Sequence, residues 1–379
     1  MIISVYIMHM NGRLDMSDKK KKKKNPNVKW GIALVVEILV LVLMVVGYGA
    51  FWANEKLNAI QYEEIKEENI VKNEGANNDQ KGYKTIALFG IDSRSTDSMK
   101  EGNRSDTIMI ASINEETHEV RIVSVYRDTI LEIADGSGLT AKVNAAYSYG
   151  GPELAINTLN ANLDLEITDF VTVNFLALIK AIDNLGGIQI HVEDNELLML
   201  NACITEQINI TGIYSEGVFE TGDLLLNGTQ ATGYARIRST DQGDITRTER
   251  QRDVLNKMLQ KAKTADMETL ENIIDDVFPN VCTSISKDEM LALAKGLLEY
   301  EMGPTVGFPI AYMPYDHGTK GSILVPADLN TNVAALHEFL FGTKNYVPTQ
   351  SVQNISMKIQ TETGIWPQEI DVDALLTEQ

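Results

Sequence analysis

Residues 84–128 read KTIALFGIDSRSTDSMKEGNRSDTIMIASINEETHEVRIVSVYRD. Within this stretch, apolar runs rich in β-branched residues are separated by polar segments, as is typical of strands joined by loops. Charged residues stand where the runs begin or end, and ligands usually bind at the strand ends of α/β sheets. The stretch therefore predicts strands of one sheet, with a candidate site at their ends.

The rest of the chain alternates between helical and extended patterns. This alternation predicts an α/β fold, in which helices cover both faces of a sheet. Residues 195–220 have the composition of loops and short pieces inserted into it. Beyond the opening stretch, helices are predicted at 139–163, 175–185, the second half of 235–264, 266–278, 287–300 and 331–342, and strands at 169–175, 186–194, 306–314 and 321–327.

A membrane anchor is predicted near the N-terminus. Residues 31–53 carry no charge except Glu37, and a helix of about 20 such residues crosses a bilayer. Six lysines at 19–24 precede the run, so the positive-inside rule leaves residues 1–30 in the cytoplasm as a basic tail. A cleaved signal peptide is the alternative, but the run is longer than the usual signal segment and no A-x-A site follows. The sequence favours a single-pass membrane protein whose remainder is extracytoplasmic.

Beyond the anchor, composition divides the chain into three regions. Residues 54–83 are polar and predict an extracytoplasmic linker, residues 84–343 predict the main domain, and residues 344–379 predict a weakly structured tail. The cysteines, Cys203 and Cys282, could form one bridge or remain two buried thiols, and both readings stay open. No Cys/His spacing indicates a zinc site.

Charge is spread unevenly along the chain. The formal net charge is −20, but residues 1–30 carry +6, so the remaining residues carry −26. An acidic body argues against nucleic acid as a partner, because a phosphate backbone requires a basic surface. Clustered arginines are unusual against this background.

Four short segments nevertheless concentrate arginine and aspartate at predicted strand ends or at a helix start. Arginine offers a planar fork of donors that matches phosphate oxygens, and carboxylates on neighbouring loops commonly hold Mg²⁺ beside substrate phosphates. Each segment alone is more often a solvated surface, but their coincidence in an acidic domain favours a phosphate site. The segments are GIDSR with Asp92 and Arg94, NRSDT with Arg104 and Asp106, VYRD with Arg127 and Asp128, and ARIRSTDQGDITRTERQ with Arg236, Arg238, Asp244, Arg247, Arg250 and Gln251.

The chain resembles the LytR-CpsA-Psr family of cell-wall glycopolymer transferases. The resemblance rests on GIDSR, RSDTIMI, SVYRDT followed by KVNAAYSYGG, FVTVNF with the later IDNLGG, and LNGTQATGYARIRSTDQGDITRTERQ. The resemblance runs from about residue 84 to about residue 255, with an extension to about 343. It implies a three-layer α/β/α sandwich with a mixed central sheet and an apolar pocket for a polyprenyl chain. It also implies that the 84–343 domain transfers a glycopolymer from undecaprenyl pyrophosphate to peptidoglycan at the membrane, with Mg²⁺ or alternatively Mn²⁺ as cofactor.

The resemblance also implies roles for individual residues. Many family members have a second arginine four residues after Arg127, where this chain has Leu131, and Arg94 is the candidate substitute. Asp92 and Asp106 correspond to the metal ligands. The pyrophosphate-binding candidates are Arg94, Arg104, Arg127, Arg236, Arg238, Arg247 and Gln251, and the catalytic candidates are Asp92, Asp106, Arg127, Asp244 and Arg247.

The hypothesis for the reaction is attack by a sugar hydroxyl on the anomeric carbon, with displacement of lipid pyrophosphate. A hydroxyl gains from a base within hydrogen-bond reach, for which Asp244 is the first candidate and Asp92 the second. Three alternatives stand beside this hypothesis: a lipid-pyrophosphate hydrolase that would use the same residues, a non-enzymatic transcription attenuator and a catalytically inactive scaffold. The acidic outer domain argues against the attenuator, and the complete set of aspartates and arginines argues against the scaffold.

Overall fold

The computed structural model describes residues 56–76, 79–91, 104–237, 244–262, 264–295 and 300–367. The predicted anchor at 31–53 lies outside these residues. None of the helices in the described ranges is both long enough and apolar enough to span a bilayer.

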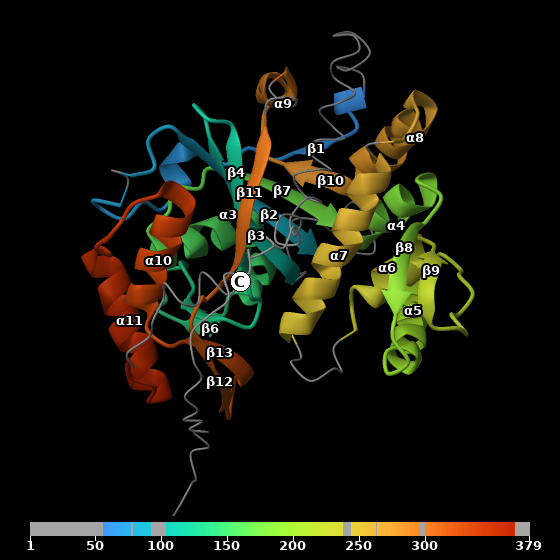
Figure 1. Ribbon diagram of the computed structural model, residues 1–379. Helices are drawn as coiled ribbons and strands as arrows, with labels where there is room; N and C mark the ends of the chain where they lie inside the picture. Colours follow the sequence, from blue (N-terminus) through green and yellow to red (C-terminus); the bar gives the residue numbers. More distant parts are fainter. Residues whose placement is uncertain are drawn as a thin grey trace, which may run out of the picture.

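A mixed sheet of seven strands forms the centre of the fold, in the order β1-β10-β7-β2-β3-β4-β11 (Figure 1). β3 is antiparallel to both β2 and β4, whereas β7 is parallel to β2 and β11 is parallel to β4. The predicted α/β class and mixed central sheet are therefore confirmed. The strands are β1 (Gln61–Tyr62), β2 (Tyr83–Ile91), β3 (Ser105–Asn114), β4 (Glu119–Val125), β7 (Asp169–Asn174), β10 (Val281–Thr283) and β11 (Glu301–Phe308).

Helices cover both faces of this sheet, because its strands are apolar on both sides. In β2, Ile86 and Leu88 belong to one core, while Ala87 and Phe89 belong to the other. Figure 1 shows α3, α10 and α11 on one side of the sheet and α4 to α8 on the other. The helices are α3 (Asn144–Leu163), α4 (Phe175–Asn184), α5 (Leu197–Thr211), α6 (Gly228–Tyr234), α7 (Asp244–Ala262), α8 (Met267–Val277), α9 (Lys287–Lys295), α10 (Leu329–Phe341) and α11 (Gln350–Thr363).

Within the described residues, three small ribbons and two 3₁₀ turns lie outside the central sheet. The predicted strand at 186–194 pairs in one of these ribbons rather than joining the central sheet, since its exposed residues alternate with buried ones. The ribbons are β5–β6 (Ile130–Glu132 and Thr140–Lys142), β8–β9 (Ile188–Val192 and Gly222–Leu226) and β12–β13 (Tyr312–His317 and Gly321–Pro326), and the turns are η1 (Glu67–Asn69) and η3 (Phe278–Asn280).

The loop prediction for 195–220 is wrong for most of its length, because α5 occupies that stretch. Leu200, Cys203, Ile204 and Gln207 face the core at helical spacing. Leu198 is 81% exposed, so apolar residues also occupy the outer face. Because apolar residues lie on both faces of α5, the sequence does not show the spacing of apolar residues that is typical of an amphipathic helix.

The flanking regions are also more ordered than predicted. In the supposed linker, Leu57 and Ile70 are buried and β1 joins the sheet beside β10. In the supposed weakly structured tail, α11 packs on α10 and α3, capped by the Thr349 hydroxyl. The buried face of α11 mixes Val352 and Ile359 with polar residues, so its apolar period is weak in the sequence.

Asp164 joins these two flanking regions to the domain. It is fully buried directly after α3, and its carboxylate accepts hydrogen bonds from Asn73 Nδ2 at 2.7 Å and from the Thr349 amide at 2.7 Å. The Thr349 hydroxyl and the Tyr346 hydroxyl donate to the same carboxylate at 2.6 and 3.2 Å. One carboxylate therefore ties the segment before β2 and the segment before α11 to the end of α3.

The structure resolves the alternatives for the cysteines. Cys203 and Cys282 are both buried, and no disulfide joins them. Buried thiols of this kind pack as small apolar side chains.

Candidate active site

The register of the sheet brings the central acid and arginine together. In the antiparallel pair of β3 and β4, Ile108 lies opposite Val125, so Asp106 and Arg127 meet at the same edge of the sheet. Arg127 Nη1 is 2.5 Å from Asp106 Oδ1, and the two side chains are 14% and 18% exposed. The pair is thus partly shielded from water, which strengthens its electrostatic interaction.

Two further charged residues, Asp128 and Lys142, stabilise the position of Arg127. Asp128 Oδ2 lies 3.5 Å from Arg127 Nε, and Lys142 Nζ lies 2.8 Å from Asp128 Oδ1. Charges of alternating sign therefore run from Lys142 to Asp106 and fix the guanidinium in place.

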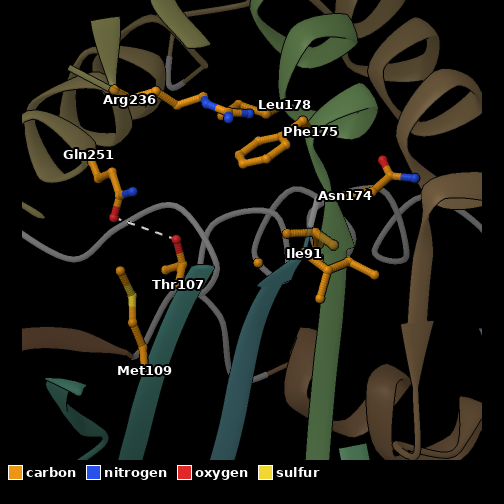
Figure 2. Close-up of a pocket in the computed structure, with 11 residues that line it drawn as sticks. Ile91, Thr107, Met109, Asn174, Phe175, Leu178, Arg236 and Gln251 are labelled. Carbon is orange, nitrogen blue, oxygen red and sulfur yellow. Dashed lines mark hydrogen bonds between the residues drawn. The ribbon is translucent and has the colours of Figure 1, made fainter. Parts of the chain in front are cut away.

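An apolar pocket opens beside this edge, on the α4 side of the sheet (Figure 2). It encloses about 570 Å³, part of which is open to solvent. Gly90 on β2 leaves room where a side chain would meet Thr107, since an added Cβ would lie 3.0 Å from the Thr107 Cβ. The lining residues are Gly90, Ile91, Thr107, Met109, Val173, Asn174, Phe175, Leu178, Ala235, Arg236 and Gln251.

Polar groups are concentrated at one side of the pocket. Figure 2 shows Thr107 and Gln251 facing each other, and the Thr107 hydroxyl donates to Gln251 Oε1 at 3.5 Å. Arg247, one helical turn before Gln251 on α7, is 3% exposed. The pocket therefore combines an apolar wall with a border of amide, hydroxyl and guanidinium groups.

Arg236 lies across the pocket from Thr107, above the ring of Phe175 (Figure 2). Its Cζ is 5.1 Å from the ring centroid, within the range of a cation–π interaction. Arg236 Nη2 is 2.8 Å from Glu206 Oε1, and the Gln207 amide oxygen, oriented to suit its neighbours, accepts from Arg236 Nη1 at 2.6 Å. An anion in the pocket would therefore share Arg236 with two residues of α5.

The remaining predicted site residues lie either at the start of an element or outside the described ranges. Arg104 is exposed directly before β3, and Asp244 is the first residue of α7. Leu131, at the position where many relatives have arginine, is fully buried in β5, so that position faces the core. The predicted residues that lie outside the described ranges are Asp92, Arg94 and Arg238.

Asp106 provides the kind of ligand that Mg²⁺ prefers, since hard cations bind carboxylate oxygens and usually keep water or phosphate ligands as well. Within the described ranges, no three His, Cys, Asp or Glu side chains form a metal-binding group. Asp106 alone therefore fits as one ligand of such an ion, and Asp92 or substrate phosphates would have to complete the set.

Sequence reasoning missed several residues around the pocket. Thr107 lies in the RSDTIMI run, but its place in the polar border depends on Gln251, which the fold brings within 3.5 Å of its hydroxyl. Phe175 was visible only as the last residue of the FVTVNF run, and Glu206 and Gln207 carry no local signal, because their contacts to Arg236 are made between distant elements. Lys142 was visible only as part of the KVNAAYSYGG run.

Comparison with known proteins gives consistent similarities. The LytR_cpsA_psr family model matches residues 48–303. The polyisoprenyl-teichoic acid–peptidoglycan teichoic acid transferase TagU of Enterococcus faecalis is 32% identical over 68% of this chain and 79% of its own length. The corresponding transferase TagV of Bacillus subtilis is 30% identical over 66% of this chain. The match spans 63% of the length of TagV, slightly less than two thirds of that protein. A crystal structure of a Streptococcus agalactiae protein has a TM-score of 0.58 at 24% identity, covering 74% of this chain and 95% of that one, and supports the fold.

Proposed function

This chain belongs to the LytR-CpsA-Psr family, and we propose that it transfers a glycopolymer from a polyprenyl-pyrophosphate carrier to peptidoglycan at the outer face of the cell membrane. One observation carries this proposal: an apolar pocket lies beside a border of buried and half-buried arginines. That combination suits a ligand with a hydrocarbon chain and an anionic headgroup. The names of the similar transferases, which specify a polyisoprenyl-linked polymer and a peptidoglycan acceptor, support the same ligand class.

The two parts of the ligand would occupy different parts of the site. Met109, Phe175 and Leu178 offer apolar surface, and each buried methylene of a polyprenyl chain contributes about 0.8 kcal/mol. The pyrophosphate would lie at the polar border, near Arg127 and Gln251. Arginine binds phosphate oxygens through two parallel hydrogen bonds, which adds orientation to attraction.

In the proposed reaction, the acceptor hydroxyl attacks the anomeric carbon, and the bond from that carbon to the pyrophosphate oxygen breaks. This chain's residues act chiefly by electrostatic stabilisation. Negative charge grows on the departing lipid pyrophosphate, and pre-positioned guanidinium groups stabilise that charge more in the transition state than in the ground state. Arg127 is the best placed, since Asp128 and Asp106 already fix its orientation. Asp244 remains the first candidate for the base that takes the proton of the acceptor hydroxyl, and Asp92 the second.

We further propose Mg²⁺ as the cofactor, with Asp106 and Asp92 as its protein ligands. When bound, the ion would neutralise pyrophosphate charge and polarise a phosphoryl oxygen.

A transfer assay tests the proposed function. Full-length protein in liposomes is mixed with a polyprenyl-pyrophosphate-linked polymer and purified peptidoglycan, and both the polymer on the peptidoglycan and the released lipid are measured. Polymer joined to peptidoglycan is the expected result. Attack on the anomeric carbon would release lipid pyrophosphate, whereas attack on the polymer-bearing phosphorus would release lipid monophosphate. Free polymer without any joined product would instead indicate a hydrolase.

Removal of divalent cations is expected to lower the transfer rate at least about 10-fold, because the ion supplies several kcal/mol of charge stabilisation. Addition of Mg²⁺ after EDTA treatment should restore the rate, and Asp106→Asn should require a higher Mg²⁺ concentration for its half-maximal rate. A full rate in excess EDTA would exclude the proposed cofactor.

A further inference from the structure

Arg250 and Glu196 form an ion pair in the interior, away from the pocket lining. Their exposed fractions are 6% and 5%. Arg250 Nε donates to Glu196 Oε1 at 2.7 Å, and the other Glu196 oxygen accepts from the Glu193 amide at 2.9 Å. A buried ion pair adds little stability over an apolar pair of the same volume, because desolvation offsets its attraction. Its contribution to stability alone does not account for this pair.

The pair connects the two segments that carry the predicted headgroup residues. Arg250 Nη1 donates to the carbonyl of Ile237 at 3.3 Å, and Ile237 directly follows Arg236 in the chain. Arg250 itself lies on α7, three residues after Arg247 and directly before Gln251. One guanidinium therefore bonds the segment that follows α6 to the helix that borders the pocket.

Glu196 extends this connection to α5. It immediately precedes that helix, and α5 also carries Glu206 and Gln207, which hold Arg236. The same helix thus contacts Arg250 near its start and Arg236 further along. Both arginines depend on the position of α5.

Arg250 does not belong to the pocket lining. Its Cζ lies 5.8 Å from the centroid of the Tyr234 ring. Burial, followed by the charges of Glu196 and Asp253, raises the pKa of Tyr234 to about 12, so the ring stays neutral beneath the guanidinium. A ligand in the pocket would therefore meet Gln251 and Arg236, and Arg250 would act through them.

We propose that Arg250, held by Glu196, is a positioning residue that fixes the 235–237 segment, α7 and α5 relative to one another. Its planar fork bonds a carboxylate and a carbonyl at the same time, which a lysine ammonium cannot match in geometry. Displacement of a ligand-binding group by about 1 Å can lower a rate about 100-fold. The effect on the headgroup rests on the proposed function, whereas the effect on the 235–237 segment does not.

The test replaces the ion pair with apolar residues of similar size, as Arg250→Met/Glu196→Leu in the full-length protein. Because the desolvation cost disappears with the charges, the melting temperature should stay within about 5 °C of the wild type. Hydrogen exchange of the Arg236 and Ile237 amides, which bond to Gly233 and Tyr234, should accelerate at least tenfold. The affinity for farnesyl pyrophosphate, measured by calorimetry, should fall at least tenfold.

The partly exposed ion pair of Arg121 and Glu119 gives a matched control, since its atoms lie 3.0 Å apart on β4, away from the pocket lining. Arg121→Met/Glu119→Leu should leave both the exchange of these amides and the affinity unchanged. If the buried double variant does not fold, Arg250→Lys retains a charge opposite Glu196 and serves instead. A folded buried variant with wild-type exchange and wild-type affinity would overturn the positioning role. If the wild type binds no pyrophosphate, the proposed function fails, and the exchange measurement alone decides the positioning role.

Discussion

Replacement of Arg127 by glutamine is expected to lower the transfer rate about 100-fold or more, the size of loss seen when one pre-positioned donor is removed from a charge-stabilising site. Arg127 follows β4 at the sheet edge, and its guanidinium lies 2.5 Å from Asp106 and 3.5 Å from Asp128. Glutamine cannot supply positive charge to a departing pyrophosphate. The loss should appear in kcat, because the stabilised charge develops in the transition state.

Arg121→Gln is the matched control for this prediction, since Arg121 lies on the same strand but pairs with Glu119 and the Phe339 carbonyl. It should keep the wild-type rate. Arg127→Lys should fall between the two variants, because lysine keeps the charge but lacks the fork. A full rate for folded Arg127→Gln would remove Arg127 from the proposed mechanism.

Loss of Arg127 also leaves Asp106 without its partner, so a fall in activity must be separated from a fall in stability. The Asp106 side chain is 18% exposed, so solvent screens part of the unpaired charge. Circular dichroism and thermal unfolding of each variant decide this point. An unfolded Arg127→Gln at the assay temperature would move the test to Arg127→Lys.

The sequence predicted that Asp106 and Arg127 stand at strand ends, although it did not predict that the two strands pair with each other. Apolar runs located β3 and β4, and the residue before one run shares an edge with the residue after the other because the two strands pair antiparallel. The polar border of the pocket could be predicted in part as well, because the segment ARIRSTDQGDITRTERQ contains Arg247 and Gln251. Local pattern therefore specified the residues that lie at the ends of regular elements.

The supports of those residues were not accessible from the sequence. Glu206 holds Arg236 from α5, which the sequence suggested was loop, and Glu196 holds Arg250 across 54 positions of the chain. Such contacts depend on how helices pack, and a single charged residue on a helix gives no indication of its distant partner. Packing also placed Leu131 in the core, where no headgroup contact can form.

The position of the C-terminal helix also depends on contacts between distant residues, and their loss is the second large effect that we expect. Asp164→Ala is expected to lower the free energy of unfolding by about 3–5 kcal/mol, because it leaves several buried donors unsatisfied. Asn73, Tyr346 and Thr349 all donate to this carboxylate, which is fully buried. Asp164 also has φ +54°, a left-handed conformation that costs alanine more than aspartate.

Urea unfolding measures this loss, and limited proteolysis between α10 and α11 reports whether α11 separates from α3 first. Asp164→Asn is the matched variant, since asparagine tolerates the left-handed conformation and retains one acceptor oxygen. It should cost less than alanine, because only part of the acceptor capacity is lost. Equal and small losses for both variants would mean that α11 is held by its apolar face, chiefly Val352 and Ile359, rather than by Asp164. A large loss for alanine with early cleavage before α11 would instead establish that a single buried carboxylate makes the C-terminal helix part of the domain.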